Sequence, residues 1–257
     1  MILDDLMAAV EPMMLAGFLV FLRVGALLAL LPAFGEMMVP VRVKLALALA
    51  LTTLVTPAVA PTVEISPEQS ILFVAASETV TGLAHGFVLR LFVFVLQITG
   101  TIAAQATSLS QLFGGDAIDP QPALGVVLVL GGLALATLMG FHVRIVAMLI
   151  ESYIHWPAGI PLPANATADW AVGAISSAFR LAVILSMPFL LASLLYNLAL
   201  GVINRAMPQL MVAFVGAPAI TLGALVLLAL TAPLILSGWV GYVMEQINHP
   251  LGAFRGR

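Results

Sequence analysis

The sequence has no cysteine and few charged residues, and these absences exclude several classes of protein. Without cysteine, the chain of 257 residues forms no disulfide, no thiolate metal site and no cysteine nucleophile. Only 8% of its residues are charged and 62% are hydrophobic, against about 25% and about 45–50% in soluble proteins. With a mean hydropathy of +1.17, this composition predicts a membrane protein.

The charged residues that are present form no basic surface. The net charge is −3 and the chain has no run of Lys or Arg, so we do not expect nucleic-acid binding. Near the start lie Asp4, Asp5 and Glu11 with no basic residue, and this segment therefore lacks the basic region of a cleaved signal peptide. We expect the first apolar run to be retained.

Six apolar blocks follow one another along the chain. A bilayer core of about 30 Å takes roughly 20 helical residues, so the first two blocks fit one crossing each and the other four are too long. The third would reach about 50 Å and is expected to be broken, bent or partly outside lipid. We predict an all-α, polytopic membrane-type helical protein with about six long, partly kinked hydrophobic segments. The blocks are residues 12–31, 43–60, 71–104, 125–150, 171–203 and 218–247.

Prolines and glycines inside the blocks predict kinked and closely packed helices. Pro57, Pro188 and Pro233 each remove a backbone donor, which neighbouring helices or water must compensate. Gly82 and Gly86 have the GxxxG spacing that suits close helix contact.

The distribution of basic residues predicts that both chain ends lie outside. Arg42 and Arg205 lie between blocks, and Lys44 lies at the very start of the second block, all on the side that this orientation makes cytoplasmic. Arg255 and Arg257 then lie on the outer side against the same rule. Either there are fewer crossings, or not every block spans the membrane.

Among the polar side chains within the apolar blocks, four are singled out: Arg23, Glu78, His85 and Arg90. An isolated Arg at the centre of a membrane helix costs about 2.5–3.5 kcal/mol, so Arg23 is expected to face protein or water. A pathway or subunit contact and a buried pair with a carbonyl or carboxylate are equal alternatives for it. Glu78 and His85 lie two helical turns apart and share a face. An internal ion pair or a polar subunit contact is favoured there over a proton relay.

No pattern typical of an enzyme or a metal site is found in the sequence. The stretch "FGGDAIDP" resembles the GxGD motif of intramembrane aspartyl proteases, but Phe113 replaces the first Gly and no second Asp lies in an apolar block. His142 and His155 do not form an HExxH pattern. We expect no cofactor, no metal and no enzymatic activity.

The stretch "TSLSQLFGGDAIDPQPALG", residues 107–125, is predicted to be a loop. Gly114 and Gly115 permit unusual backbone angles, and the residues before each of its two prolines disfavour helix. An ordinary solvated connection is the simpler interpretation. Leu112 and Phe113 beside the glycines also fit a plug in a protein-lined channel, because a plug must pack when closed and move when open.

Several motifs occur together in one order and spacing. They are residues 23–57, 77–87 ("SETVTGLAHGF"), 118–125 ("IDPQPALG"), 140–159 ("GFHVRIVAMLIESYIHWPAG") and 200–223 ("LGVINRAMPQLMVAFVGAPAITLG"). This set resembles the FliR family of the flagellar type III secretion system, which has homologues in virulence injectisomes. The resemblance covers nearly the whole chain, and its most specific part is Gly201, Asn204-Arg205 and Pro208-Gln209-Leu210.

The resemblance implies one export-gate membrane domain over residues 1–257, with a FliP-like part at 1–170 and a FliQ-like C-terminal hairpin at 171–257. It implies a core subunit of the flagellar type III protein export gate, which forms with FliP-type and FliQ-type subunits the channel for unfolded flagellar proteins. FlhB-type and FlhA-type proteins are further implied partners. The implied location is the flagellar basal body in the bacterial inner (cytoplasmic) membrane. Injectisome versions share these motifs, and the flagellar system is favoured as the commoner context.

The resemblance also implies two functional segments. The first is a pore plug, with Leu112, Phe113, Gly114, Gly115, Asp116, Asp119 and Pro120. The second is an assembly and inner-mouth motif, with Gly201, Asn204, Arg205, Pro208 and Gln209. This chain departs from the usual pattern at Met211, where the family has Asn, and at Ile220, where it has Lys.

Two other functions stay open from the residues alone. A secondary transporter of small solutes would also have broken helices and intramembrane charges such as Arg23 and Glu78. The chain shows no internal repeat of the kind that many transporters have. An inert scaffold subunit is the other alternative. In a gate subunit the loop at residues 107–125 would line the lumen of the channel, and in a scaffold it would not.

Overall fold

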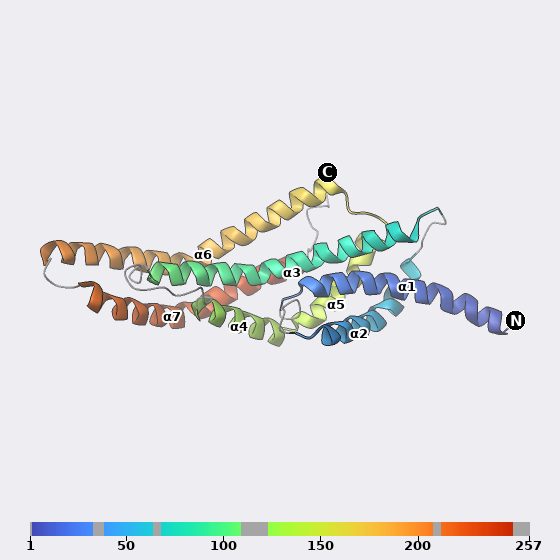
Figure 1. Ribbon diagram of the computed structural model, residues 1–257, viewed down its shortest axis with the longest axis horizontal. Coiled ribbons are helices and arrows are strands. Elements are labelled where there is room, and N and C mark those ends of the chain that lie inside the picture. The colour runs from blue at the N-terminus through green and yellow to red at the C-terminus, as the bar shows by residue number, and fades with distance from the viewer. Residues whose placement is uncertain (1, 33–38, 64–67, 109–122, 208–211, 249–257) are drawn as a thin grey trace. The chain divides into compact units, whose positions relative to one another are not determined.

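The computed structural model describes residues 2–32, 39–63, 68–108, 123–207 and 212–248, and every regular element in these ranges is helical. The elements are α1 (Ile2–Leu30), α2 (Val41–Val59), a 3-10 turn η1 (Ala60–Thr62), α3 (Ile71–Ser108), α4 (Ala123–Leu138), α5 (Phe141–His155), α6 (Ala164–Ala206) and α7 (Val212–Asn248) (Figure 1). The predicted all-α fold is confirmed.

Most of these helices are long and apolar enough to cross a membrane. Within the described ranges, five segments meet that test, and α4 with α5 form a sixth if the pair is one broken span. The five segments are Pro12–Leu30, Val41–Thr62, Ile71–Thr107, Ala164–Ala206 and Ala219–Ile247. The polytopic membrane fold predicted from the apolar blocks is therefore confirmed.

Two blocks differ from the simplest expectation. The third block was expected to be broken, bent or partly outside lipid. It forms one continuous helix, α3, which excludes a break. The fourth is divided into α4 and α5 at Gly140, which has a left-handed φ of 75° and precedes the first residue of α5. Glycine adopts this conformation without steric cost, and the helix therefore ends and restarts there. Pro57 and Pro188 lie inside α2 and α6 without ending either helix.

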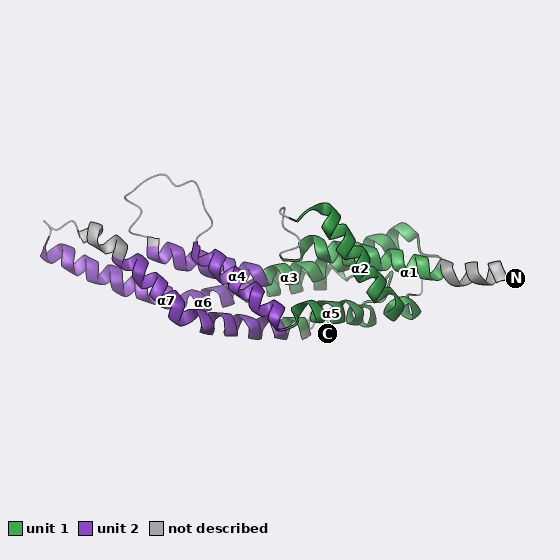
Figure 2. Cartoon of the chain, turned by 90° about the horizontal axis from the view of Figure 1, so that it is seen from below, with its two compact units in different colours: residues 1–91, 140–174, 245–257 green, residues 92–139, 175–244 purple. Residues whose placement is uncertain are grey.

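The chain forms two compact units, coloured separately in Figure 2. Unit 1 consists of Met1–Leu91, Gly140–Ala174 and Glu245–Arg257, and unit 2 of Phe92–Met139 and Ile175–Met244. The boundaries fall inside α3, α6 and α7, so these helices contribute residues to both units.

In unit 1, α1 packs against α2 and against the first part of α3. The contact with α3 is close because Gly82 and Gly86 have no side chain. A Cβ atom on Gly86 would lie 2.8 Å from the carbonyl oxygen of Leu27, and one on Gly82 would collide with the carbonyl oxygen of Arg23. The close contact predicted from the GxxxG spacing is confirmed, and it places the backbones of α1 and α3 against each other.

In unit 2, the second part of α3 packs against α4, α6 and α7. Gly100 of α3 and Gly125 of α4 bring two backbones together, since a Cβ atom on Gly100 would collide with Gly125. The indole Nε1–H of Trp239 in α7 donates to the carbonyl oxygen of Phe92 at 2.7 Å. The hydroxyl of Thr99, which donates to the carbonyl oxygen of Val95 in its own helix at 2.7 Å, also lies 3.2 Å from the carbonyl oxygen of Ala182 in α6. The bond from Trp239 satisfies an indole N–H that the hydrocarbon of a bilayer could not.

Candidate functional site

A buried ion pair joins α1 to α3 in unit 1. The Nε–H of Arg23 donates to Oε2 of Glu78 at 2.8 Å, and Nη2–H donates to Oε1 at 2.9 Å. Both side chains are 1% exposed. The arrangement is the bidentate fork that makes Arg–carboxylate pairs both strong and geometrically specific.

Three groups at the C-terminal end of α5 complete this pair. The Nη1–H of Arg23 donates to the Ser152 hydroxyl at 2.9 Å, and Nη2–H also donates to the carbonyl oxygen of Trp156 at 3.0 Å. The hydroxyl of Tyr153 donates to Oε2 of Glu78 at 3.0 Å. The ring of Tyr153 also lies 3.7 Å from the guanidinium carbon of Arg23, so it adds a cation–π contact. We call these five residues the Arg23 cluster.

The Arg23 cluster connects three helices, α1, α3 and α5, through charges removed from solvent. A buried ion pair is tolerated only when further hydrogen bonds satisfy its remaining donors and acceptors, and here Ser152, Tyr153 and Trp156 supply them. Removing one partner of such a pair typically costs about 3–5 kcal/mol, because the other charge is left buried alone. This geometry fixes the positions of the three helices and leaves little capacity to bind a solute.

His85 lies on the same face of α3, two turns beyond Glu78. Its Nδ1–H donates to the carbonyl oxygen of Thr81 at 2.8 Å, and the side chain is 1% exposed. Among the described residues, its Nε2 is a buried polar atom without a hydrogen-bond partner. The ring thus extends the polar face of α3 along Glu78 and Thr81 without joining the ion pair.

The structure therefore brings together two of the four intramembrane polar residues singled out in the sequence. Arg23 and Glu78 form the pair, His85 is buried nearby on α3, and Arg90 is partly exposed further along that helix. Sequence reasoning missed Ser152 and Tyr153. The feature that could have indicated them is the polar run "ESY" in the last turns of α5, directly after the apolar run "IVAMLI".

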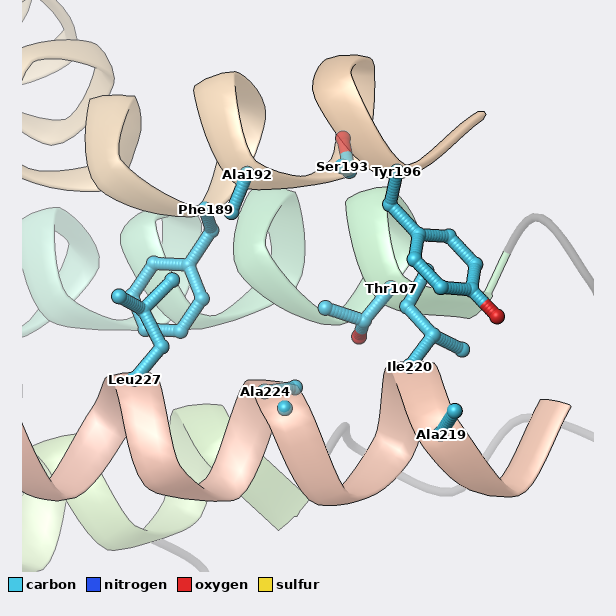
Figure 3. Close-up of a pocket in the computed structure, with 10 residues that line it drawn as sticks. Thr107, Phe189, Ala192, Ser193, Tyr196, Ala219, Ile220, Ala224 and Leu227 are labelled. Carbon is cyan, nitrogen blue, oxygen red and sulfur yellow. The ribbon is translucent and has the colours of Figure 1, made fainter. Parts of the chain in front are cut away.

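Unit 2 contains a cavity of about 200 Å³ between α6, α7 and the end of α3. In Figure 3, Phe189 and Leu227 lie at one end, and Tyr196 and Ile220 at the other. The hydroxyl of Ser193 donates to the carbonyl oxygen of Leu190 in its own helix. With alanine side chains and the backbone of Gly223 between them, these residues present a largely apolar wall. Ile220 contributes to it and is 7% exposed.

The end of α6 is open to its surroundings. Gly201, Asn204 and Arg205 are all exposed, and no described atom would lie within 4 Å of a Cβ atom on Gly201. Pro208 and Gln209 of the predicted assembly motif lie outside the described residues, as does Met211. The predicted plug residues also lie outside them: Leu112, Phe113, Gly114, Gly115, Asp116, Asp119 and Pro120.

Fold and site together define a class. The protein is a polytopic, all-helical membrane protein in which the buried charges of Arg23 and Glu78 pair with each other. Its residues 14–246 match the family described as bacterial export proteins, family 1. The flagellar biosynthetic protein FliR of Caulobacter vibrioides is 32% identical over 234 residues, which cover 90% of this chain and 93% of that protein. The chain belongs to the FliR family.

Further relatives agree with this assignment. The flagellar biosynthetic protein FliR of Aquifex aeolicus is 30% identical over 88% of each chain. That of Escherichia coli is 30% identical over 83% of each chain. The similarity thus spans most of both proteins in every pair. The protein is a membrane-bound component of the flagellar export apparatus.

Proposed function

We propose that the chain is a core subunit of the flagellar type III protein export gate. With FliP-type and FliQ-type subunits it forms the channel through which unfolded flagellar proteins pass. FlhB-type and FlhA-type proteins are its further partners, and the assembly lies in the bacterial inner membrane at the flagellar basal body. The subunit performs no chemistry in this proposal.

The observation that carries the proposal is that α6 exposes apolar side chains over a length greater than the thickness of a bilayer core. α6 has 43 residues. At about 1.5 Å per residue it is roughly twice as long as a bilayer core is thick. Its N-terminal part nevertheless exposes Val172, Ile175 and Phe179, by 67%, 48% and 56%. A helix that leaves lipid with such residues exposed needs protein to cover it.

The C-terminal end of α6 is a second candidate surface for contact with another subunit. Glycine inside a helix is less favourable than alanine by about 1 kcal/mol, and no described neighbour requires it at position 201. Open space above Gly201 allows another chain to approach closely. Asn204 and Arg205, one turn on, add exposed polar groups that give such a contact its specificity.

The proposed division of labour follows the family resemblance. Residues 1–170 form a FliP-like part, and the Arg23 cluster fixes three of its helices. Residues 171–257 form a FliQ-like hairpin built from α6 and α7. The segment at about 107–125 is the pore plug, and the assembly motif lies at the inner mouth.

Substituting Arg205 tests the assembly motif. We expect Arg205→Glu to abolish secretion of flagellar proteins and co-purification of partner subunits, while the chain accumulates normally in the membrane. Arg205→Lys retains the charge and should retain most of the activity. Normal swimming by the Arg205→Glu strain would contradict the proposal.

Shortening the plug tests the channel itself. Deleting residues 113–116 should make the assembled gate leak ions or small molecules, measured as a fall in membrane potential on expression. A deletion of equal length at the C-terminus, residues 254–257, is the control. A tight membrane in the plug deletion, with normal amounts of the assembled complex, would count against a plug in this segment.

A further inference from the structure

We draw no further inference here: the strongest candidate, the cavity of unit 2 between α6, α7 and the end of α3, has a largely apolar lining, and nothing in the described part of the chain shows what occupies it.

Discussion

The arginine of the Arg23 cluster and the arginines on the exposed face of α6 differ in burial and in hydrogen bonding. In the cluster, the guanidinium of Arg23 is 1% exposed and donates to a carboxylate, a hydroxyl and a backbone carbonyl of its own chain. On α6, Arg180 and Arg205 are exposed, and the described residues offer them neither an ion pair nor a hydrogen bond.

This difference distinguishes a charge that stabilises the fold of the chain, in the Arg23 cluster, from charges that face outward, on α6. A charge in an apolar setting needs a partner, and where that partner lies shows what the residue is for. The Arg23 cluster is complete within one chain, so it fixes the positions of helices. The arginines of α6 are exposed and make no ion pair or hydrogen bond within the described part of the chain, so they do not hold its helices together.

The largest effect is expected from breaking the buried pair. Arg23→Met leaves the Glu78 carboxylate buried without its cation and should destabilise the chain by about 3–5 kcal/mol. The double variant Arg23→Met with Glu78→Leu removes both charges and should recover most of that loss. Thermal unfolding in detergent measures both. Equal losses in the single and double variants would show that the charges themselves are not what holds α1 and α3.

A smaller loss of stability is expected from a substitution where the backbones of α1 and α3 approach closely. Gly82→Ala places a methyl group against the carbonyl oxygen of Arg23 and should cost about 1–3 kcal/mol through displacement of α1. Gly25 of α1 is the matched control, since a Cβ atom there would have no described neighbour within 4 Å. Gly25→Ala should be neutral or stabilising by up to about 1 kcal/mol. Similar unfolding temperatures for the two variants would disprove the close packing of α1 and α3.

The smallest effect on stability is expected at the end of α6. Arg205→Ala changes an exposed side chain and should shift the unfolding free energy by less than about 0.5 kcal/mol. The same variant should nevertheless impair secretion, because the proposed function assigns Arg205 to a contact with another subunit. Thermal unfolding and a secretion assay on one variant separate the two. A large loss of stability would place the partner of Arg205 within the chain.

The sequence predicted the helical fold well because apolar runs of bilayer length leave few alternatives. Backbone groups in lipid must be satisfied within a segment, and runs such as residues 12–31 therefore form helices. The break at Gly140 was missed. A single glycine between apolar runs indicates a break only when the surrounding fold requires its positive φ, and periodicity carries no such information.

The charge cluster was predicted only in part for a similar reason. Helical spacing placed Glu78 and His85 on one face of a helix, but it cannot show which face of which other helix lies opposite. The pairing of Glu78 with Arg23, and the roles of Ser152 and Tyr153, depend on three helices meeting in space. Arg180 was not singled out in the sequence, although it is the one charged residue in the apolar block of residues 171–203.

The most direct test of the export-gate assignment is the composition of the complex that the chain forms. The tagged chain would be expressed with its neighbouring genes, purified in detergent and weighed by native mass spectrometry. We predict a large complex that holds one copy of this chain with several copies of two small membrane proteins. Recovery of the chain alone, or as a simple homodimer, would contradict the assignment.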